Sequence, residues 1–159
     1  MSEKQMLKIG DKIPDFVLKD QHNKELRLSE LKGKKVLLSF HPLAWTKICA
    51  QQMQSLEENL SRFRELNTVP LGLSVDTVPS KHAWAKELGI KDTRLLSDFW
   101  PHGAVAKKLG LFRDKEGSSE RANIIIDEDQ NVIFLKVYDI PQLPDIEEII
   151  NFLKMRNGA

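Results

Sequence analysis

The chain has 159 residues, 41% of them hydrophobic, and its 24 Lys and Arg residues nearly balance 23 Asp and Glu residues. This length suits one domain with a sizeable hydrophobic core, so we expect residues 1–159 to form a single domain. The near-zero net charge, without a long basic or acidic run, removes the electrostatic argument for nucleic acid or an anionic membrane as a partner.

The first predicted elements are a short hairpin and a buried strand. Residues 15–19 and 25–28 read as two short strands around the polar turn 20–23. Lys34 and Lys35 then open an apolar run that ends at Phe40 and predicts a buried strand.

A helix and a second buried strand follow. From Cys49 onward, apolar residues recur in steps of four and three, which predicts one amphipathic helix with a buried stripe of Met53, Leu56, Leu60 and Phe63. Pro70 introduces a second apolar run through Val75. A helix between two buried strands predicts a parallel, right-handed βαβ unit.

The second half predicts further helices, a loop and a hairpin. The helices are expected at 80–88, 103–109 and from about Pro144, the first two of them ended by glycines, with a short strand at 94–97 and a loop at 114–119. Residues 122–126 and 132–138 flank a polar turn, as in a β-hairpin. The order predicts an α/β fold with a central mixed sheet and helices on both faces.

The chain has a single cysteine, Cys49, which the pattern places in the first turn of a helix, just past a buried strand. Backbone N–H groups there have no intrahelical acceptor, and the helix dipole adds partial positive charge. Both effects favour the thiolate, which is the reactive form of cysteine. One cysteine also excludes an internal disulfide and a multi-thiolate metal site, and with no apolar signal or membrane-length segment in the sequence we expect a cytoplasmic protein.

The residues around Cys49 resemble a known family. The spacing Pro42-x-x-x-Thr46-x-x-Cys49 is similar to the active-site signature of the peroxiredoxins, of the alkyl hydroperoxide reductase and thiol-specific antioxidant type. Other segments resemble the family in the same order along the chain: 10–16, His82 and Trp84, 95–98 and 121–127. The resemblance implies a thioredoxin-like fold and a thiol peroxidase that reduces hydrogen peroxide or small organic hydroperoxides.

The resemblance also implies a role for four residues. Cys49 is expected to be the peroxidatic nucleophile that becomes a sulfenic acid. Thr46 is expected to hydrogen-bond the thiolate and the peroxide, Pro42 to shield the thiolate from water, and Arg121 to stabilise the thiolate and the leaving oxygen. No metal or other cofactor is expected, because the thiolate carries the chemistry.

Two departures from the family pattern stand out. Gln52 occupies a position where an acidic residue is usual, and a resolving cysteine is absent, Gln54 standing where some relatives carry one. The resemblance is therefore to a one-cysteine peroxiredoxin, regenerated by an external thiol: a thioredoxin-like or glutaredoxin-like protein, or a small thiol. The family's habit implies a homodimer formed near the active-site loop.

Other interpretations of the same residues stay open. Cys49 would also suit a thiol-based redox sensor that passes its oxidation to a partner, or an inert thiol in a non-catalytic thioredoxin-fold binding module. Trp45 to Cys49 has the spacing of a thioredoxin motif, but Thr46 replaces the first cysteine and excludes dithiol exchange. His41 lies close enough in sequence to tune Cys49, and Trp84 is either a core residue or a pocket wall.

Overall fold

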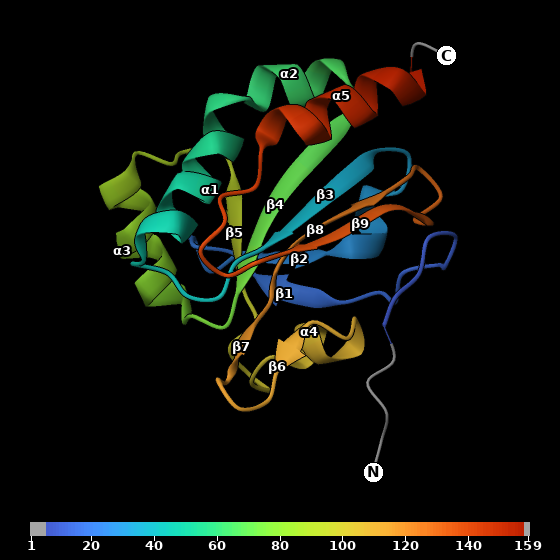
Figure 1. Ribbon diagram of the computed structural model, residues 1–159. Helices are drawn as coiled ribbons and strands as arrows, with labels where there is room; N and C mark the ends of the chain where they lie inside the picture. Colours follow the sequence, from blue (N-terminus) through green and yellow to red (C-terminus); the bar gives the residue numbers. More distant parts are fainter. Residues whose placement is uncertain (1–5, 158–159) are drawn as a thin grey trace.

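The protein, described by a computed structural model over residues 6–157, is built on a seven-stranded mixed sheet (Figure 1). The strands are β1 (Val17–Lys19), β2 (Glu25–Arg27), β3 (Lys35–Phe40), β4 (Thr68–Ser74), β5 (Arg94–Ser97), β6 (Phe112–Arg113), β7 (Ser118–Ser119), β8 (Arg121–Ile126) and β9 (Val132–Tyr138). The helices are the short 3-10 helix η1 (Leu28–Leu31), α1 (Lys47–Glu58), α2 (Leu60–Glu65), α3 (Val78–Leu88), α4 (Ala104–Lys108) and α5 (Ile146–Asn157). The mixed α/β class expected from the sequence is confirmed.

The sheet has the strand order β2-β1-β5-β4-β3-β8-β9. Strands β3 and β4 are parallel, which confirms the predicted βαβ unit, and β4 is also parallel to β5. The remaining pairs in this sheet, including the β8–β9 hairpin, are antiparallel. Pro70, expected to precede its strand, lies inside β4, ahead of Leu71, where the pairing with β5 starts.

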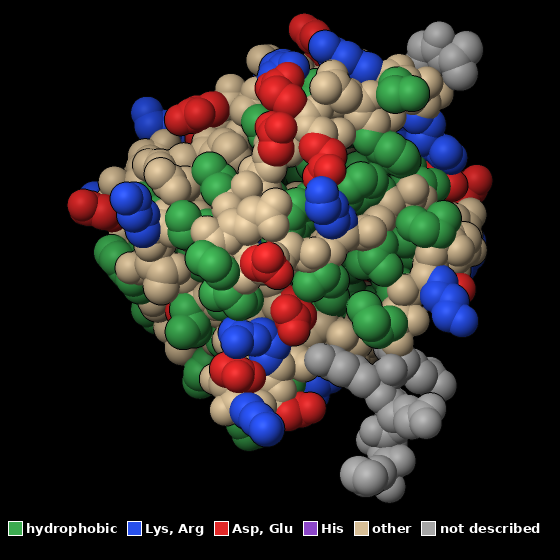
Figure 2. Space-filling model, in the orientation of Figure 1, with side chains coloured by type: hydrophobic (Ala, Val, Ile, Leu, Met, Phe, Trp, Pro, Cys, Tyr) green, Lys and Arg blue, Asp and Glu red, His purple; other side chains and the backbone are tan. Residues whose placement is uncertain are grey.

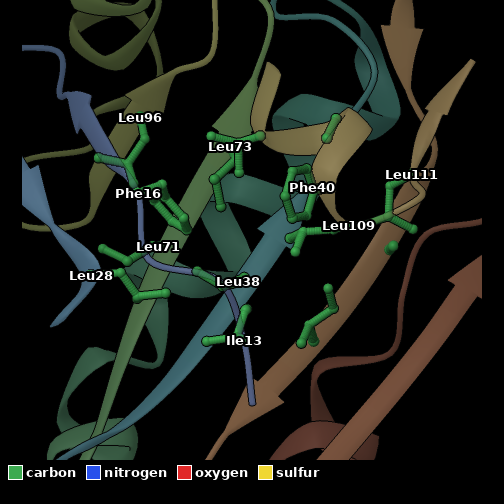
Figure 3. Packing of buried hydrophobic residues seen from close by; sticks show 14 of the residues in the cluster. Ile13, Phe16, Leu28, Leu38, Phe40, Leu71, Leu73, Leu96, Leu109 and Leu111 are labelled. Atoms are coloured by element: carbon green, nitrogen blue, oxygen red, sulfur yellow. The ribbon is translucent and has the colours of Figure 1, made fainter. Parts of the chain in front are cut away.

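Alternation along the strands separates two apolar layers. Val36, Leu38 and Phe40 of β3 join one cluster with α4 and the N-terminal segment (Figure 3). Leu37 points to the opposite face, into a second cluster with α1, α2, α3 and α5. Since successive side chains of a strand point to opposite faces, the two-sided burial of β3 explains its continuous apolar run. Figure 1 shows α4 on one side of the sheet and the longer helices on the other.

The single helix predicted from Cys49 to Phe63 is wrong in one respect: it is two helices, α1 and α2, separated at Asn59. The Asn59 side chain donates to the carbonyl oxygen of Ser55 at 2.7 Å and accepts from Arg62 at 3.0 Å. An asparagine that hydrogen-bonds local groups in this way competes with the helical ladder. The apolar stripe continues across the break, so periodicity alone did not reveal it.

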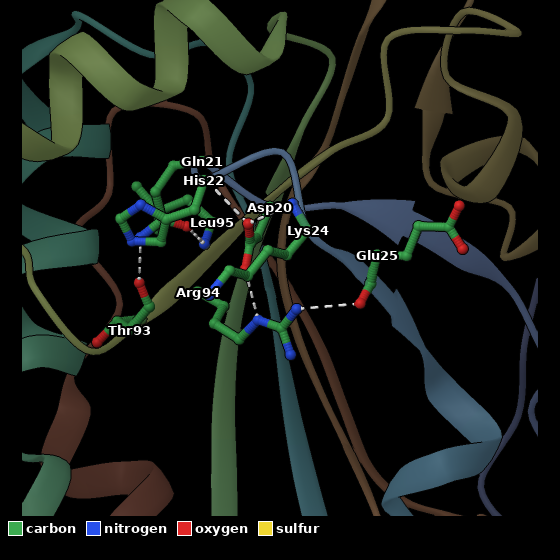
Figure 4. Close-up of polar contacts among 8 residues, drawn as sticks. All are labelled: Asp20, Gln21, His22, Lys24, Glu25, Thr93, Arg94 and Leu95. Atoms are coloured by element: carbon green, nitrogen blue, oxygen red, sulfur yellow. Dashed lines mark hydrogen bonds and ion pairs between the residues drawn. The ribbon is translucent and has the colours of Figure 1, made fainter.

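The first two residues of the polar turn between β1 and β2, Asp20 and Gln21, are buried against the start of β5 (Figure 4). Asp20 accepts hydrogen bonds from the backbone of His22 and Lys24 and from Arg94 Nε at 2.7 Å. Gln21 pairs with the β5 backbone like an added strand residue: it donates to the Thr93 carbonyl and accepts from Leu95 N–H, both at 2.8 Å. These side-chain bonds fasten the N-terminal hairpin to the sheet.

The segment 114–119 was predicted as a loop, but its last two residues form β7, which pairs with β6. Within residues 6–157, no helix has the length and apolar character needed to cross a membrane. Basic and acidic side chains are intermixed over the face seen in Figure 2, in keeping with the balanced composition.

Candidate active site

The site forms where β3 ends and α1 begins. The loop 41–46 joins them, and Thr46 occupies the N-cap position of α1. Asp76, in the loop after β4, fixes this segment: its Oδ2 accepts from Ala44 N–H at 2.8 Å and from Ser74 Oγ at 2.6 Å. Cys49 is therefore the third residue of α1, in its first turn as predicted, and it is fully buried.

Arg121 contacts Cys49 from β8. Alternation along β8 places Arg121, Asn123 and Ile125 on the sheet face that α1 covers. Arg121 Nη1 donates to Cys49 Sγ at 3.3 Å, and its Nε donates to the carbonyl oxygen of Ile140 at 2.8 Å. Because the guanidinium is buried and always charged, it provides a fixed positive charge at the sulfur.

Gln52 orients the guanidinium in place of an acidic residue. Its Oε1 accepts from Arg121 Nη1 at 2.8 Å, and its Nε2 donates to Ser39 Oγ at 2.7 Å and to the Phe40 carbonyl at 3.1 Å. All three contacts suit a neutral amide, which both donates and accepts. The positive charge of Arg121 is therefore not cancelled by a carboxylate at Gln52.

The hydrogen bonds continue from Gln52 across the sheet. Ser39 donates to Asn123 Oδ1 at 2.8 Å, Asn123 Nδ2 contacts the Tyr138 hydroxyl, and Tyr138 donates to Glu148 of α5 at 2.8 Å. Burial, together with the neighbouring Glu148 carboxylate, raises the pKa of Tyr138 well above its usual range. The chain of contacts thus links the thiol to α5 through groups that keep their hydrogen-bonding roles at neutral pH.

Thr46 and Pro42 lie beside Cys49 in one pocket, together with Arg121. The Thr46 hydroxyl donates its proton to the carbonyl oxygen of Leu43 at 2.9 Å. The structure therefore brings all four predicted residues together. Among the described residues, Arg121 hydrogen-bonds the sulfur, whereas the Thr46 hydroxyl bonds to Leu43 instead.

The pocket over Cys49 has a volume of about 500 Å³. The rest of its wall contains four apolar side chains, Leu43, Ile48, Ile140 and Pro141. Its polar side chains are Lys47, Ser118 and the ion pair of Arg113 with Glu116 at 3.5 Å. Hydrogen peroxide needs far less space than this, so the pocket also accommodates a larger organic group.

Two buried basic residues, Lys81 and His41, contact each other beside Trp84 in the core. Lys81 of α3 is completely buried, with Nζ 3.5 Å from Nε2 of His41, which follows β3. The His41 ring packs on Trp84 at 5.4 Å between centroids, so Trp84 is a core residue. Sequence reasoning missed Lys81, although its helical spacing from Trp84 and Ala85 places it on the same buried stripe.

Burial lowers the pKa of both Lys81 and His41. Burial lowers the pKa of Lys81 to about 8, although the charges of Asp76, Cys49 and Asp98 act in the opposite direction. Burial, and then the charge of Lys81, lowers the pKa of His41 well below its usual value. His41 is therefore neutral at physiological pH.

Two of the histidines lie close together: His22 and His82 approach each other at 6.1 Å between ring centroids. Among residues 6–157, no group of three or more His, Cys, Asp and Glu side chains is arranged to hold a metal ion.

Comparisons with known proteins agree with this geometry. The model of the AhpC/TSA family matches residues 9–135. Alkyl hydroperoxide reductase E of Mycobacterium tuberculosis is 39% identical over 123 residues, which cover 77% of this chain and 80% of that protein. Peroxiredoxin-1 of Gekko japonicus is 31% identical over 156 residues, covering 92% of this chain and 77% of that protein.

Solved structures show the same likeness. The reduced 2-Cys peroxiredoxin of Plasmodium vivax superposes with a TM-score of 0.85 at 29% identity, over 94% of this chain and 82% of that chain. Peroxidoxin BcpB from Mycobacterium tuberculosis gives a TM-score of 0.83 at 28% identity, over 94% of this chain and 97% of that chain.

Proposed function

Because the chain belongs to the AhpC/TSA family of peroxiredoxins, thiol-dependent peroxidases with a thioredoxin-like fold, we propose that Cys49 is its peroxidatic residue. The observation that carries the assignment is the 3.3 Å hydrogen bond from Arg121 to the buried sulfur, in the wall of the pocket that both residues line. A charged donor aimed at a buried thiol favours the thiolate, which is the attacking form.

The proposed reaction begins with attack of the Cys49 thiolate on the terminal oxygen of a hydroperoxide. An S–O bond forms as the O–O bond breaks, the sulfur loses two electrons, and the leaving oxygen takes a proton to become water or an alcohol. Arg121 stabilises the negative charge as it moves from the sulfur to the leaving oxygen. A donor already in position does this without reorganising during the reaction.

Thr46 and Pro42 shape the approach of the peroxide. Since the Thr46 hydroxyl proton is donated to Leu43, its oxygen is free to accept a hydrogen bond from the O–H of the peroxide. That bond would align the O–O bond with the sulfur. Pro42, on the pocket wall, limits the access of water to the thiolate.

Regeneration requires a second protein or a small thiol, because the sequence contains one cysteine. The thiol of the reductant attacks the sulfenic sulfur and releases water, which gives a mixed disulfide. A second thiol then restores the Cys49 thiol and leaves as the oxidised reductant. A thioredoxin-like or glutaredoxin-like protein or a small thiol would serve, and the cytoplasm supplies these under reducing conditions.

The substrates include hydrogen peroxide and small organic hydroperoxides. The apolar wall formed by Leu43, Ile48, Ile140 and Pro141 favours an organic group over water. This feature supports faster reaction with an alkyl hydroperoxide than with hydrogen peroxide.

A homodimer is proposed on the basis of an aromatic surface beside the site. This surface, called the aromatic ridge below, consists of three aromatic residues, Trp45, Phe99 and Trp100, together with Leu43. Their exposed fractions are 55%, 45%, 80% and 44% in that order. Trp45 Nε1 donates to Ser80 at 3.0 Å, while Phe99 and Trp100 line a pocket with Pro79, so both halves flank the first turn of α3. Clustered exposed aromatic residues are typical of protein interfaces.

The test is stopped-flow reaction of the reduced protein with peroxide, followed by mass spectrometry. We expect a second-order rate constant far above that of free cysteine, and a mass increase of one oxygen located at Cys49. The Cys49→Ser variant is the matched control and should not react. A rate like that of free cysteine would contradict the proposal and would favour the inert thiol, and fast oxidation without turnover by any thiol donor would favour a redox sensor.

A further inference from the structure

Lys81 is a fully buried lysine that the proposed reaction does not yet use. It lies on α3, on the same stripe as Trp84, and that stripe packs in the apolar cluster that contains Cys49. A lysine is almost never fully buried unless it is paired. Its surroundings should therefore show what the ammonium group does.

No carboxylate pairs directly with Lys81 among the ion pairs of the described residues. The two acids whose charges act on Lys81 already accept other hydrogen bonds. Asp76 accepts from Ala44 N–H and Ser74 Oγ, and Asp98 accepts from two N–H groups in the first turn of α4. Burial raises the pKa of Asp98, while those N–H groups lower it.

The direct contact of Lys81 is His41. If the ammonium donates to Nε2 of His41, the ring must be neutral and carry its proton on Nδ1. Nδ1 is buried and has no hydrogen-bond partner among the described residues. The charges of Arg121 and Lys81 both lower the pKa of His41 and so keep its ring neutral. This arrangement leaves the positive charge on Lys81, on the buried stripe that it shares with Trp84.

We propose that Lys81 is a positioning residue of the peroxidase reaction: a second buried cation that stabilises the Cys49 thiolate together with Arg121. The inference rests on the proposed role of Cys49. The charged groups that act on Lys81 are Asp76, Asp98 and Cys49, so the thiolate is one of three negative charges that balance it.

If Lys81 stabilises the thiolate, the reactivity of Cys49 depends on the protonation of Lys81 as well as on the ionisation of the thiol itself. Burial lowers the pKa of Lys81 to about 8, so the ammonium loses its proton within a range that a cell can approach. Above that pH the thiolate keeps Arg121 but loses its second cation. Reactivity should then level off or fall as pH rises through about 8, instead of following the thiolate alone.

The first experiment measures the coupling without any peroxide. The ε-CH2 group of Lys81 is followed by NMR from pH 6 to 11 in the reduced wild type and in Cys49→Ser. We expect the midpoint to be lower in Cys49→Ser by about half to one pH unit, because the neutral hydroxyl no longer stabilises the ammonium. Equal midpoints would overturn the proposal.

The second experiment measures the reciprocal effect. The thiolate absorbance of Cys49 is titrated in Lys81→Met and in Lys86→Met, which removes an exposed lysine from the same helix. Lys81→Met should raise the midpoint by the same amount as in the first experiment, since coupling is reciprocal, and Lys86→Met should leave it unchanged. Equal shifts in both variants would contradict a specific role for Lys81.

The two proposals fail separately. A slow peroxide reaction with coupled titrations would contradict the peroxidase assignment alone, and a fast reaction with independent titrations would contradict the role of Lys81 alone. If Lys81→Met does not fold, the NMR comparison still decides, because it uses the wild type and a conservative substitution at Cys49.

Discussion

Thr46 shows how one hydrogen bond defines a residue's role. Its proton is already donated to Leu43, so it can act on the peroxide only as an acceptor. We expect Thr46→Val to slow peroxide reduction by about tenfold, the factor that corresponds to losing one neutral hydrogen bond of roughly 1–1.5 kcal/mol.

Thr46→Ser keeps the hydroxyl and is the matched control. Stopped-flow rate constants for both variants check the prediction, with the thermal unfolding midpoint as a test of folding. A Thr46→Val variant as fast as Thr46→Ser would remove the hydroxyl from the mechanism.

The lowered pKa of Lys81 predicts that the stability of the folded protein depends on pH. The folded state binds this proton with a pKa of about 8, below the value of 10.5 for a free lysine. Between these values the unfolded chain binds more protons, so the free energy of unfolding should rise with pH by on the order of 3 kcal/mol. Denaturant unfolding from pH 7 to 10.5 should show this rise in the wild type but not in Lys81→Met; parallel curves would contradict it.

Among single residues, the sequence predicted those that belong to a recognisable motif or family segment. Cys49, Thr46, Pro42 and Arg121 do share one pocket, and Cys49 is in the first turn of α1. Lys81 was missed because an isolated lysine in a mixed helix is usually exposed. Its spacing from Trp84 and Ala85 indicates which face of α3 it shares, and the packing of α3 in the structure shows that this face is covered.

Gly72 controls how closely α1 approaches the sheet. A Cβ at this β4 position would overlap Met53, one turn beyond Cys49, and would lie 2.9 Å from Leu95 Cδ2. Gly72→Ala should destabilise the protein by about 1–3 kcal/mol, the usual cost of overpacking, and displace the helix that carries the thiol.

Chemical denaturation measures the stability loss, and the rate of peroxide reduction measures the displacement. Gly89→Ala, at an open helix end, is a useful comparison because no atom lies within 4 Å of its Cβ, although its φ of 73° adds backbone strain. A Gly72→Ala variant with wild-type stability and rate would show that Met53 moves aside freely.

The elements themselves were largely predictable, because strand alternation and helical spacing follow from which faces are buried. The strand at 94–97 and the hairpin of β8 and β9 agree with the sequence. The break at Asn59 and the short β6–β7 pair were not predicted, since a side-chain hydrogen bond and a two-residue pairing leave no periodic signal.

For the whole molecule, the aromatic ridge predicts the oligomeric state. Trp100→Glu should weaken a dimer by about one to two orders of magnitude, because aromatic residues often dominate interface energies. Sedimentation equilibrium measures the change, with Met155→Glu on α5 as a control at another exposed apolar residue. An unaltered dimer in Trp100→Glu would place the interface elsewhere.

The arrangement of the whole sheet is less visible in the sequence than its parts. The parallel βαβ unit followed from handedness rules, but the pairing of β1 with β5 depends on Gln21 and Asp20, which look like ordinary turn residues. Buried polar side chains of this kind become apparent only when the two segments lie together.

The neutral amide of Gln52 has a consequence for the order of events after oxygen transfer. In the proposed reaction the thiolate is the counter-ion of both Arg121 and Lys81. A sulfenic acid is uncharged, so its formation would leave both cations without that partner. An acid at position 52 would have supplied a replacement, and an amide does not. The oxidised pocket therefore attracts an incoming anion, and the anion it needs next is the thiolate of the reductant.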